Sequence, residues 1–293
     1  MIKEIDNKTV IRKCEAGFTP YTYDINIYRG CAHRCRYCYA LYSHKYLESD
    51  NFYDDIFFKK NIDLLDKELC SNKNKGELVG VGTVCDSYQP LERSLKIMPK
   101  VLSFFIKHKT PIYLSTKSNL ILRDIEQIKE LSSVTQVYIS LSITCMDEKI
   151  SSKLEPNVIS SEERFMVAKE LKEETNAFVG VHLMPIIPYL TDSKENLTAI
   201  ISRAKELNLD FVKAAPLNLF GETKKAFYNF LDREFPRQSR EIQSLYSSSK
   251  GVKDNYIRVT DFVKKVKAEV GFHNKCTCYE WKKEEPKQIS LFD

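Results

Sequence analysis

The sequence has few glycines, no repeated segment and no long apolar run, and each shortage excludes a class of protein. Nine glycines among 293 residues are far too few for a collagen repeat. We find no internal repeat of the kind that marks a solenoid, and no low-complexity tract. The most apolar stretch, residues 178–190, contains two prolines and falls short of the roughly 18 residues that a membrane span needs. The sequence therefore predicts a globular protein that does not span a membrane.

The first residues also lack the apolar core of a secretory signal, which bears on how the nine cysteines are interpreted. Residues 1–8 mix both charge signs, so we expect a cytoplasmic protein. Cytosolic thiols stay reduced, and an odd number of cysteines spread along the chain does not suggest a disulfide framework. Metal binding or catalysis is therefore the better interpretation of the cysteines.

The overall composition is that of an ordinary globular protein with a mild positive charge. Hydrophobic residues make up 43% of the chain and charged residues 29%, which excludes wholesale disorder. The formal net charge of +5 permits a polyanionic partner without requiring one. Sixteen tyrosines and sixteen phenylalanines supply flat faces for packing or for stacking on bases.

Short β-branched runs alternate with helical patterns over the first 220 residues. Six runs predict strands at Thr22–Tyr28, Glu77–Val84, Pro111–Thr116, Gln136–Ser142, Ala177–Met184 and Asp210–Ala214. Helical periodicity fits residues 91–108, 123–132, 161–174 and 193–207, and a mixed insert fills 41–75. Strands that alternate with helices indicate parallel βαβ units. The predicted α/β fold is therefore a barrel-like or a doubly wound parallel sheet.

The pattern changes after about residue 219. Residues 224–235 are aromatic and helical, 247–251 read as a loop, and a second helical run covers about 255–270. The last residues are charged and interrupted by proline, which is typical of a flexible tether. We therefore divide the chain into a barrel-like domain at 1–220, a small helical C-terminal region at 221–281 and a tail at 282–293.

Three cysteines follow the first predicted strand at the spacing C-x3-C-x2-C. A loop of this length can wrap Cys31, Cys35 and Cys38 round one metal cluster. A four-iron cluster usually has four cysteine ligands, so three ligands leave one iron free to bind another molecule. Zinc is the alternative, with His33 as a fourth ligand, but a histidine inside the loop fits ordinary finger spacing poorly. Chance spacing of buried cysteines is the remaining alternative.

This motif resembles the C-x3-C-aromatic-C signature of the radical S-adenosylmethionine (SAM) enzymes, with Tyr37 in the aromatic position. The resemblance implies a [4Fe–4S] cluster on Cys31, Cys35 and Cys38, with SAM chelating the free iron. It implies a partial (β/α)6 barrel and reductive cleavage of SAM to a 5′-deoxyadenosyl radical. In that family the aromatic residue lies against the adenine, which makes Tyr37 a candidate cofactor contact.

Further motifs resemble the spore photoproduct lyase-like family of DNA repair proteins. They occur in the family's order over about residues 22–220, at Asn26–His33, Cys38–Ala40, Gly82–Arg93, Ser115–Ser118, Arg123–Asp124, Ser140–Thr144, Leu154–Pro156 and Pro185–Pro188. The resemblance implies a lyase-type enzyme that repairs or modifies a damaged nucleobase in DNA by radical chemistry. It also implies an electron donor such as flavodoxin or ferredoxin.

Four polar residues in these motifs are candidate SAM contacts. Lys117 follows the third predicted strand and can meet the carboxylate charge, while Ser142 ends the fourth and can hydrogen-bond the same ligand. Parallel barrels place their sites at these carboxyl ends. Thr83 and Asp86, from the second motif, are the other two candidates. For an isolated lysine or serine the alternative is a solvated surface group.

The residue that returns a hydrogen atom is less clear from the pattern. In the lyase a cysteine beside this strand end does so, and alignment on Asp86 places that position at Thr83. Cys85 lies two residues further on and projects from the same face if the strand continues, so it is a candidate donor. A small buried core cysteine is the alternative. Tyr88 is a second candidate, and the departure at Thr83 weakens the case for spore photoproduct itself as substrate.

Other residues give weaker signals. Cys276, Cys278 and His273 are one ligand short of a structural zinc site. We interpret His182, in an apolar strand, as a core histidine rather than a base. Basic residues beyond the barrel either contact phosphates or are solvated; they are Lys224, Lys225, Arg237, Arg240, Lys250 and Lys253.

The C-terminal peptide Gln288-Ile289-Ser290-Leu291-Phe292 resembles the motif by which bacterial repair and replication proteins bind the sliding clamp. Leu291 and Phe292 would fill an apolar pocket while Gln288 fixes the register by hydrogen bonds. The alternative is that the peptide packs on its own domain. Two rival functions stay open: a radical SAM enzyme that acts on a peptide or small metabolite, and a non-catalytic clamp-binding metal protein.

Overall fold

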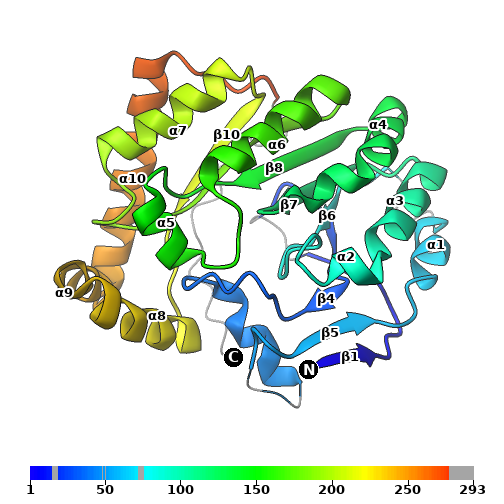
Figure 1. Cartoon of the computed structure of the whole chain (residues 1–293), viewed down its shortest axis with the longest axis horizontal. Coiled ribbons are helices and arrows are strands. Elements are labelled where there is room, and N and C mark those ends of the chain that lie inside the picture. The colour runs from blue at the N-terminus through cyan, green and yellow to red at the C-terminus, as the bar shows by residue number, and fades with distance from the viewer. Residues whose placement is uncertain (15–18, 48, 50, 72–75, 277–293) are drawn as a thin grey trace.

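The computed structural model describes residues 1–14, 19–47, 49, 51–71 and 76–276 (Figure 1). The tail predicted at 282–293, its clamp-like peptide and Cys278 lie outside these residues. Within the described part of the chain, no helix combines the length and apolar character that crossing a bilayer demands.

The main sheet contains the six predicted parallel strands in sequence order. It has the strand order β10-β9-β8-β7-β6-β3-β2, and only β2 (Ile11–Lys13) is antiparallel to its neighbour. The parallel strands are β3 (Tyr23–Ile25), β6 (Val79–Val81), β7 (Ile112–Thr116), β8 (Val137–Ser142), β9 (Phe178–Ile186) and β10 (Phe211–Pro216). This curved sheet of successive βα units confirms the predicted partial barrel.

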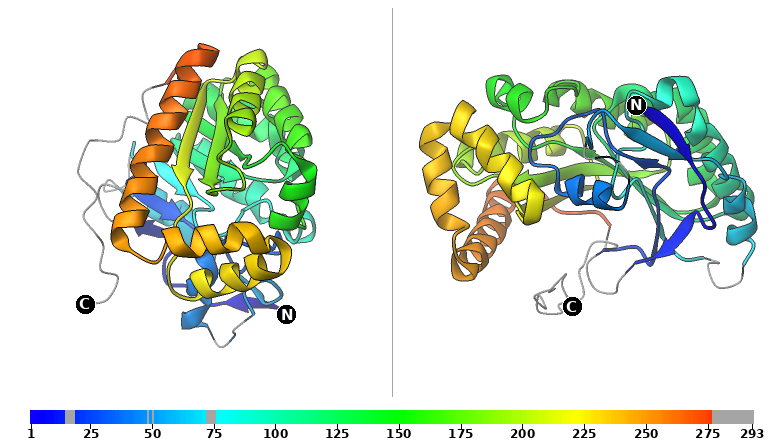
Figure 2. Two further views of the ribbon diagram at one scale, coloured as in Figure 1. Left: turned by 90° about the vertical axis from the view of Figure 1, so that its left-hand side faces the viewer. Right: turned by 90° about the horizontal axis from the view of Figure 1, so that it is seen from below.

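Helices cover the outer face of the sheet (Figures 1 and 2). They are α2 (Glu92–Leu95), α3 (Ile97–His108), the 3-10 helix η2 (Asn119–Asp124), α4 (Ile125–Val134), α5 (Glu148–Leu154), α6 (Ser161–Glu174) and α7 (Lys194–Glu206). Two of the predicted helices begin beside capping serines, because Ser160 and Ser193 each accept a backbone hydrogen bond from the first turn. In α6, Glu163 completes a capping box with Ser160.

The predicted helix at 91–108 is wrong at one point, because it is broken into α2 and α3 at Lys96. Lys96 has a left-handed backbone with φ of 51°. The buried Glu92 carboxylate accepts the backbone N–H groups of Ile97 and Met98 at 3.1 and 2.9 Å, and so caps α3. Glu92 is itself held by Arg123, at 2.8 Å. A tertiary ion pair therefore stabilises the break.

A second, three-stranded sheet lies beside the barrel and supports the cysteine loop. Its order is β1-β5-β4, from β1 (Ile2–Ile5), β5 (Ile56–Lys59) and β4 (Tyr28–Arg29). The first predicted strand, 22–28, is therefore divided between two sheets. Gly30 follows β4 with φ of 84°, and a Cβ there would approach the Asp55 carbonyl oxygen to 2.5 Å. Only glycine fits this turn into the cysteine loop. The mixed insert also contains the 3-10 helix η1 (Tyr39–Tyr46) and α1 (Leu64–Leu69).

The C-terminal helices are α8 (Gly221–Glu234), α9 (Pro236–Leu245) and α10 (Ser249–Val270). The loop predicted at 247–251 is wrong after residue 248, because Ser248 caps α10 by accepting the Gly251 N–H at 3.1 Å. Figure 2 shows α10 alongside β10 and α7. Its buried residues Val259, Val263 and Val266 belong to the same apolar core as the sheet. The proposed domain boundary at residue 220 falls directly before α8.

Candidate functional site

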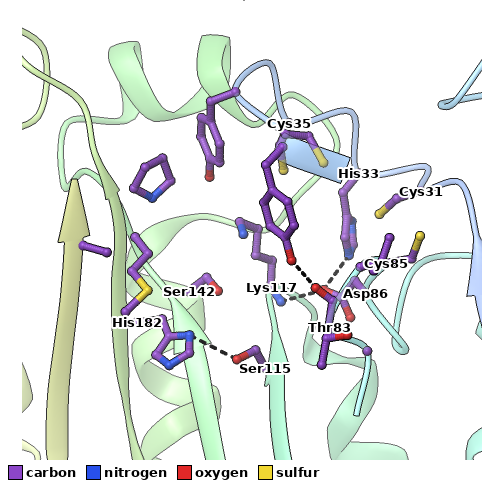
Figure 3. A pocket seen from close by; sticks show the side chains of 18 of the residues that line it. Cys31, His33, Cys35, Thr83, Cys85, Asp86, Ser115, Lys117, Ser142 and His182 are labelled. Carbon is purple, nitrogen blue, oxygen red and sulfur yellow. Dashed lines mark hydrogen bonds and ion pairs between the residues drawn. The ribbon is translucent and has the colours of Figure 1, made fainter. Parts of the chain in front are cut away.

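A cavity of about 430 Å³ lies where the cysteine loop meets the carboxyl ends of the parallel strands (Figure 3). Its lining includes all of the site residues predicted from the sequence except Tyr88: Cys31, Cys35, Tyr37, Cys38, Thr83, Cys85, Asp86, Lys117 and Ser142. The structure therefore brings together residues from the loop and from β6, β7 and β8. This is the end of a parallel barrel at which catalytic groups gather.

The cysteine loop is anchored by backbone hydrogen bonds on both sides. The Cys31 N–H donates to the Phe52 carbonyl at 3.1 Å, and the Arg36 N–H donates to the Leu154 carbonyl at 2.9 Å. Burial raises the pKa of each of the three thiols, Cys31, Cys35 and Cys38, to about 12. These sulfurs are therefore protonated by themselves, and a metal cluster that binds them must displace protons.

His33 is directed away from a metal-ligand role by its hydrogen bonds. Its Nδ1 lies 3.2 Å from the Asn157 carbonyl oxygen and its Nε2 lies 3.1 Å from the Asp86 carboxylate. Among the described residues, no group of three or more His, Cys, Asp or Glu side chains is arranged to hold a single metal ion. A thiol-only cluster suits this loop better than a zinc site that includes His33.

Asp86 connects the cysteine loop to the end of β7. Besides His33, its carboxylate accepts the Thr116 hydroxyl at 2.8 Å and the Lys117 backbone N–H at 2.8 Å. Burial alone would raise the pKa of Asp86, but His33 and these hydrogen bonds outweigh it and lower that pKa. Asp86 lines the cavity, yet its carboxylate is engaged by its own chain. Its carboxylate therefore holds the loop and the end of β7 together, and a SAM contact through Asp86 stays a prediction.

Thr83, which aligns with the lyase cysteine, and the candidate hydrogen donor Cys85 have different surroundings. The Thr83 hydroxyl donates to Asp24 at 2.7 Å and accepts from Asn26 at 2.8 Å, so it is held in a structural network. Cys85 is 4% exposed and lines the cavity close to the loop cysteines (Figure 3). Burial, and then the nearby Cys31 and Cys38, raise the pKa of Cys85 well above its usual value. Cys85 therefore keeps its S–H bond.

Tyr88 does not line the cavity. Its side chain is fully buried, and burial and then the charge of Asp124 raise its pKa well above the usual value. The Tyr88 backbone N–H donates to the Asp86 carboxylate at 2.8 Å, which closes a turn and directs the side chain into the core. In this structure Tyr88 is a core residue.

A buried charge network, which the sequence did not reveal, supports Tyr37 and Ser142. Glu155 and Arg164 are each about 1% exposed and form an ion pair at 2.8 Å. The Tyr37 hydroxyl donates to Glu155, and Arg164 donates to the Ser142 carbonyl at 2.6 Å. Burial alone would raise the pKa of Glu155, but Arg164 and Lys117 outweigh it and lower that pKa. The carboxylate therefore stays ionised.

Lys117 brings a positive charge to the same wall. Its Nζ lies 5.9 Å from the centroid of the Tyr37 ring, which is a cation–π distance. Burial alone would lower the pKa of Lys117, but the nearby Cys35 and Glu155 outweigh burial and raise that pKa above its usual value. Lys117 therefore stays protonated beside the face of the Tyr37 ring. This combination suits a nucleoside that carries a carboxylate.

His182, interpreted from the sequence as a core histidine rather than a base, also faces the cavity. It is half-buried, lines the cavity and lies 3.1 Å from the Ser115 hydroxyl oxygen through Nδ1 (Figure 3). Sequence reasoning missed it because β9 is a buried parallel strand whose apolar run hides which face points inward.

The structure adds little support for the weaker candidate residues. Cys276 packs partly buried against the aromatic cluster that contains Tyr138 and Phe211. Lys224 donates to the Tyr246 carbonyl at 2.9 Å, so this lysine supports the C-terminal helices.

Comparison with known proteins identifies the family. The family described as the radical SAM superfamily matches residues 25–199, more than half of the chain. The chain therefore belongs to the radical SAM superfamily, and it is a radical SAM enzyme. Proteins of this superfamily use a [4Fe–4S] cluster and SAM, as the cysteine motif predicted.

Relatives and solved structures agree with this assignment. The chain is 29% identical over 250 residues to an uncharacterized protein of Mycobacterium tuberculosis, covering 83% of this chain and 73% of the relative. It is 29% identical over 238 residues to one of Methanocaldococcus jannaschii, covering 80% and 84%. Spore photoproduct lyase complexed with dinucleoside spore photoproduct matches with a TM-score of 0.67 at 13% identity, covering 92% of this chain and 79% of that one. At this identity the likeness shows the fold alone.

Proposed function

We propose that this radical SAM enzyme repairs or modifies a damaged nucleobase in DNA by a lyase-type reaction. The observation that carries the proposal is a cavity in which the cysteine loop, the protonated Lys117 and an aromatic interior meet. The fold is similar to that of spore photoproduct lyase, whose solved complex contains a dinucleoside lesion. The sequence motifs quoted above point in the same direction.

The residues of the cavity fit both cofactors. Cys31, Cys35 and Cys38 would hold the cluster, because two buried thiols and one half-buried thiol in one anchored loop offer only sulfur ligands. Lys117 would meet the SAM carboxylate and Tyr37 would provide a face for the adenine. When bound, the reduced cluster and SAM supply a carbon-centred radical that removes a hydrogen atom from the substrate.

The chain itself orients these groups and shields them from water. The Glu155–Arg164 pair fixes the Tyr37 hydroxyl and the end of β8 from behind, out of contact with solvent. Among the described residues that line the cavity, Asp86 is the one carboxylate, and its own chain engages it. Within the described lining, Asp86 is therefore the one acid that acts on Lys117, and hydrogen bonds hold its carboxylate in place.

Cys85 is the proposed hydrogen donor. Its raised pKa keeps the thiol protonated, and a hydrogen atom, rather than a proton, is what a carbon radical needs. Transfer from the Cys85 sulfur to the substrate carbon would form a C–H bond and leave a sulfur radical. An electron donor such as flavodoxin or ferredoxin, together with a proton, would then restore the thiol.

A base must leave the duplex to reach this cavity. Tyr39 and Tyr42, on η1 at the rim, are 47% and 43% exposed and offer stacking faces. Tyr42 also contacts the Phe220 ring at a centroid distance of 6.0 Å. A sliding clamp remains a proposed further partner through Gln288, Leu291 and Phe292, on the sequence pattern alone.

The direct test is to incubate the reduced, cluster-reconstituted protein with SAM and ultraviolet-damaged DNA. We expect SAM cleavage that depends on damaged DNA, together with a changed lesion product, measured by mass spectrometry. Undamaged DNA of the same sequence is the control. Cleavage that ignores DNA and is stimulated instead by a peptide or small metabolite would overturn the proposal.

A further inference from the structure

The interior of the barrel is built in layers, and the layer beneath the SAM contacts is polar. At the bottom, an aromatic plug is formed by Tyr113, Tyr138 and Phe211, against which Tyr21 and Phe178 pack. The plug fits because two inward positions are glycine. A Cβ on Gly80 would come within 2.7 Å of the Tyr21 ring, and one on Gly180 within 2.3 Å of the Phe211 carbonyl oxygen. The sheet therefore closes the cavity with rings rather than with aliphatic side chains.

On the plug lies a polar layer that we call the floor ring: the Tyr113 hydroxyl, from the plug itself, with Ser115, Ser140 and His182. They come from β7, β8 and β9, with Ser115 paired to Ser140 in the sheet register. The Ser140 hydroxyl lies 2.6 Å from that of Ser115 and 2.9 Å from that of Tyr113. His182 closes the ring through Nδ1 to Ser115, at 3.1 Å, and Nε2 to Tyr113.

The floor ring offers hydrogen bonds but no charge. Burial, followed by the charges of Lys213 and Lys117, lowers the pKa of His182 to about 3, so the imidazole is neutral at physiological pH. Each hydroxyl is both a donor and an acceptor, and a neutral imidazole has one nitrogen of each kind. Three members of the ring, Tyr113, Ser115 and His182, line the cavity.

A polar layer at this depth lowers the stability gained on folding, so stability alone does not explain it. Barrel interiors are ordinarily filled by bulky aliphatic side chains, and burying polar groups carries a desolvation penalty. Beside the ring stands a flat wall, since the rings of Tyr21 and Tyr113 stack at 5.9 Å with an interplanar angle of 20°, and both line the cavity. A neutral hydrogen-bonding edge next to a flat aromatic face complements a planar, uncharged heterocycle.

We propose that the floor ring reads the hydrogen-bonding edge of the substrate's nucleobase, with Ser115 and His182 as specificity-determining residues. The edge it fits carries a ring N–H: the four hydrogen bonds within the ring use its four protons, so its hydroxyl oxygens, held in place by His182, are left as acceptors. This inference rests on the proposed function and deepens it, since it names the feature of the base that the site recognises. The charged wall around Lys117 serves the cofactor, and the floor ring serves the substrate.

The test uses the cluster-reconstituted protein with SAM and two probes. One is a short ultraviolet-irradiated oligonucleotide with adjacent thymines, and the other is the same oligonucleotide with N3-methylthymine, which lacks the ring N–H. Dissociation constants are measured by calorimetry. We expect the wild-type protein to bind the methylated probe roughly tenfold more weakly, the value of one or two lost hydrogen bonds.

Four variants test which residues cause the difference between the two dissociation constants. Ser115→Ala and His182→Leu should reduce the ratio of the two dissociation constants to within roughly twofold, because the partner of the N–H is gone. His182→Asn keeps a neutral donor and acceptor and should retain most of the ratio. Tyr138→Phe is the matched control. Its hydroxyl donates to Gln136 at 3.3 Å and does not line the cavity, so the ratio should stay at the wild-type value.

The outcomes separate failure of the inference from failure of the proposed function. If Ser115→Ala and His182→Leu keep the wild-type ratio, the floor ring does not read the base. If they raise the KM for SAM at an unchanged ratio, the ring belongs to the cofactor, and the inference is also overturned. If neither probe binds and damaged DNA does not stimulate SAM cleavage, the proposed function fails and takes the inference with it.

Discussion

The two ends of the cavity are built on opposite principles. At the cysteine-loop end, charged groups are buried: the Asp86 carboxylate is hydrogen-bonded within its own chain, and Glu155 forms an ion pair with Arg164, with Lys117 close by. At the floor ring, the pKa of His182 is held so low that no member carries charge at neutral pH. A buried ion pair fixes geometry, and breaking it by removing one partner is strongly destabilising. A neutral hydrogen bond contributes only modestly to stability. The first arrangement suits an ionic cofactor that must be held in one place, and the second suits a neutral substrate that must be distinguished from others.

The largest effect is expected from removing a cluster ligand at the charged end. Cys35→Ala should abolish both the iron–sulfur spectrum and reductive SAM cleavage, since no other cysteine of the loop can replace the lost sulfur. The fold should persist, because the loop is anchored by backbone bonds such as that from Arg36 to Leu154. Electron paramagnetic resonance measures the cluster, a SAM cleavage assay measures activity, and circular dichroism measures the fold. Cys70→Ala, at an exposed cysteine outside the cavity, is the control. Full activity in Cys35→Ala would contradict the cluster assignment.

Breaking the buried ion pair should cost more than breaking the floor ring. Glu155→Gln leaves Arg164 as an uncompensated buried cation, and we expect a loss of about 3–5 kcal/mol in the free energy of unfolding. Ser140→Ala removes hydrogen bonds between neutral groups and should cost about 1 kcal/mol. Urea unfolding of the apoprotein measures both.

A double variant, Glu155→Gln with Arg164→Met, tests the electrostatic explanation of that difference. It should recover part of the stability lost by Glu155→Gln, because the unpaired charge is gone. If the Glu155 and Ser140 variants lose equal stability, the contrast between the two ends of the cavity does not hold.

The neutral end should nevertheless make the free energy of unfolding depend more strongly on acidic pH than the charged end does. The pKa of His182 is about 3 in the folded protein, against about 6.5 for an unfolded histidine. Between these values the unfolded chain binds the extra proton, so stability is lost as the pH falls below about 6.5. The linkage relation gives a loss of about 2 kcal/mol between pH 7 and pH 5 from this residue. Unfolding at both pH values measures it, with His182→Asn as the variant that should lose this component. An equal pH dependence in wild type and variant would place the folded pKa near its ordinary value.

The barrel itself could be predicted from the sequence, because its signals are local. The strands β7, β8 and β9 and the capped helices α6 and α7 lie within a few residues of their predicted bounds. The division of the first strand and the break at Lys96 could not be predicted. Both depend on contacts between distant segments, such as the ion pair of Glu92 with Arg123.

The site shows the same division between local and distant information. The cysteine loop could be recognised because its spacing is itself the signal. Glu155 lay in a motif without an evident role, and Arg164 lay in an ordinary helix, so their pairing became visible only when the chain was folded. The position of His182 in the cavity lining could not be predicted, because inward and outward positions of a buried parallel strand look alike in sequence. Tyr88 is close to Asp86 along the chain, but the turn at Asp86 carries its side chain into the core.

The smallest effect on either end of the cavity is expected from deleting residues 288–292, the clamp-like peptide. The peptide begins 250 residues after Cys38 in sequence and contains none of the predicted site residues of the cavity. SAM cleavage and the ratio of probe affinities should therefore stay at wild-type values. Binding to a bacterial sliding clamp should be lost, from a dissociation constant around micromolar, or about −8 kcal/mol, as suits a peptide of this length. Titration of the clamp against the intact and the shortened protein measures this. Equal binding by both would remove the clamp as a partner, and loss of folding on deletion would identify the peptide as a strap packed on its own barrel.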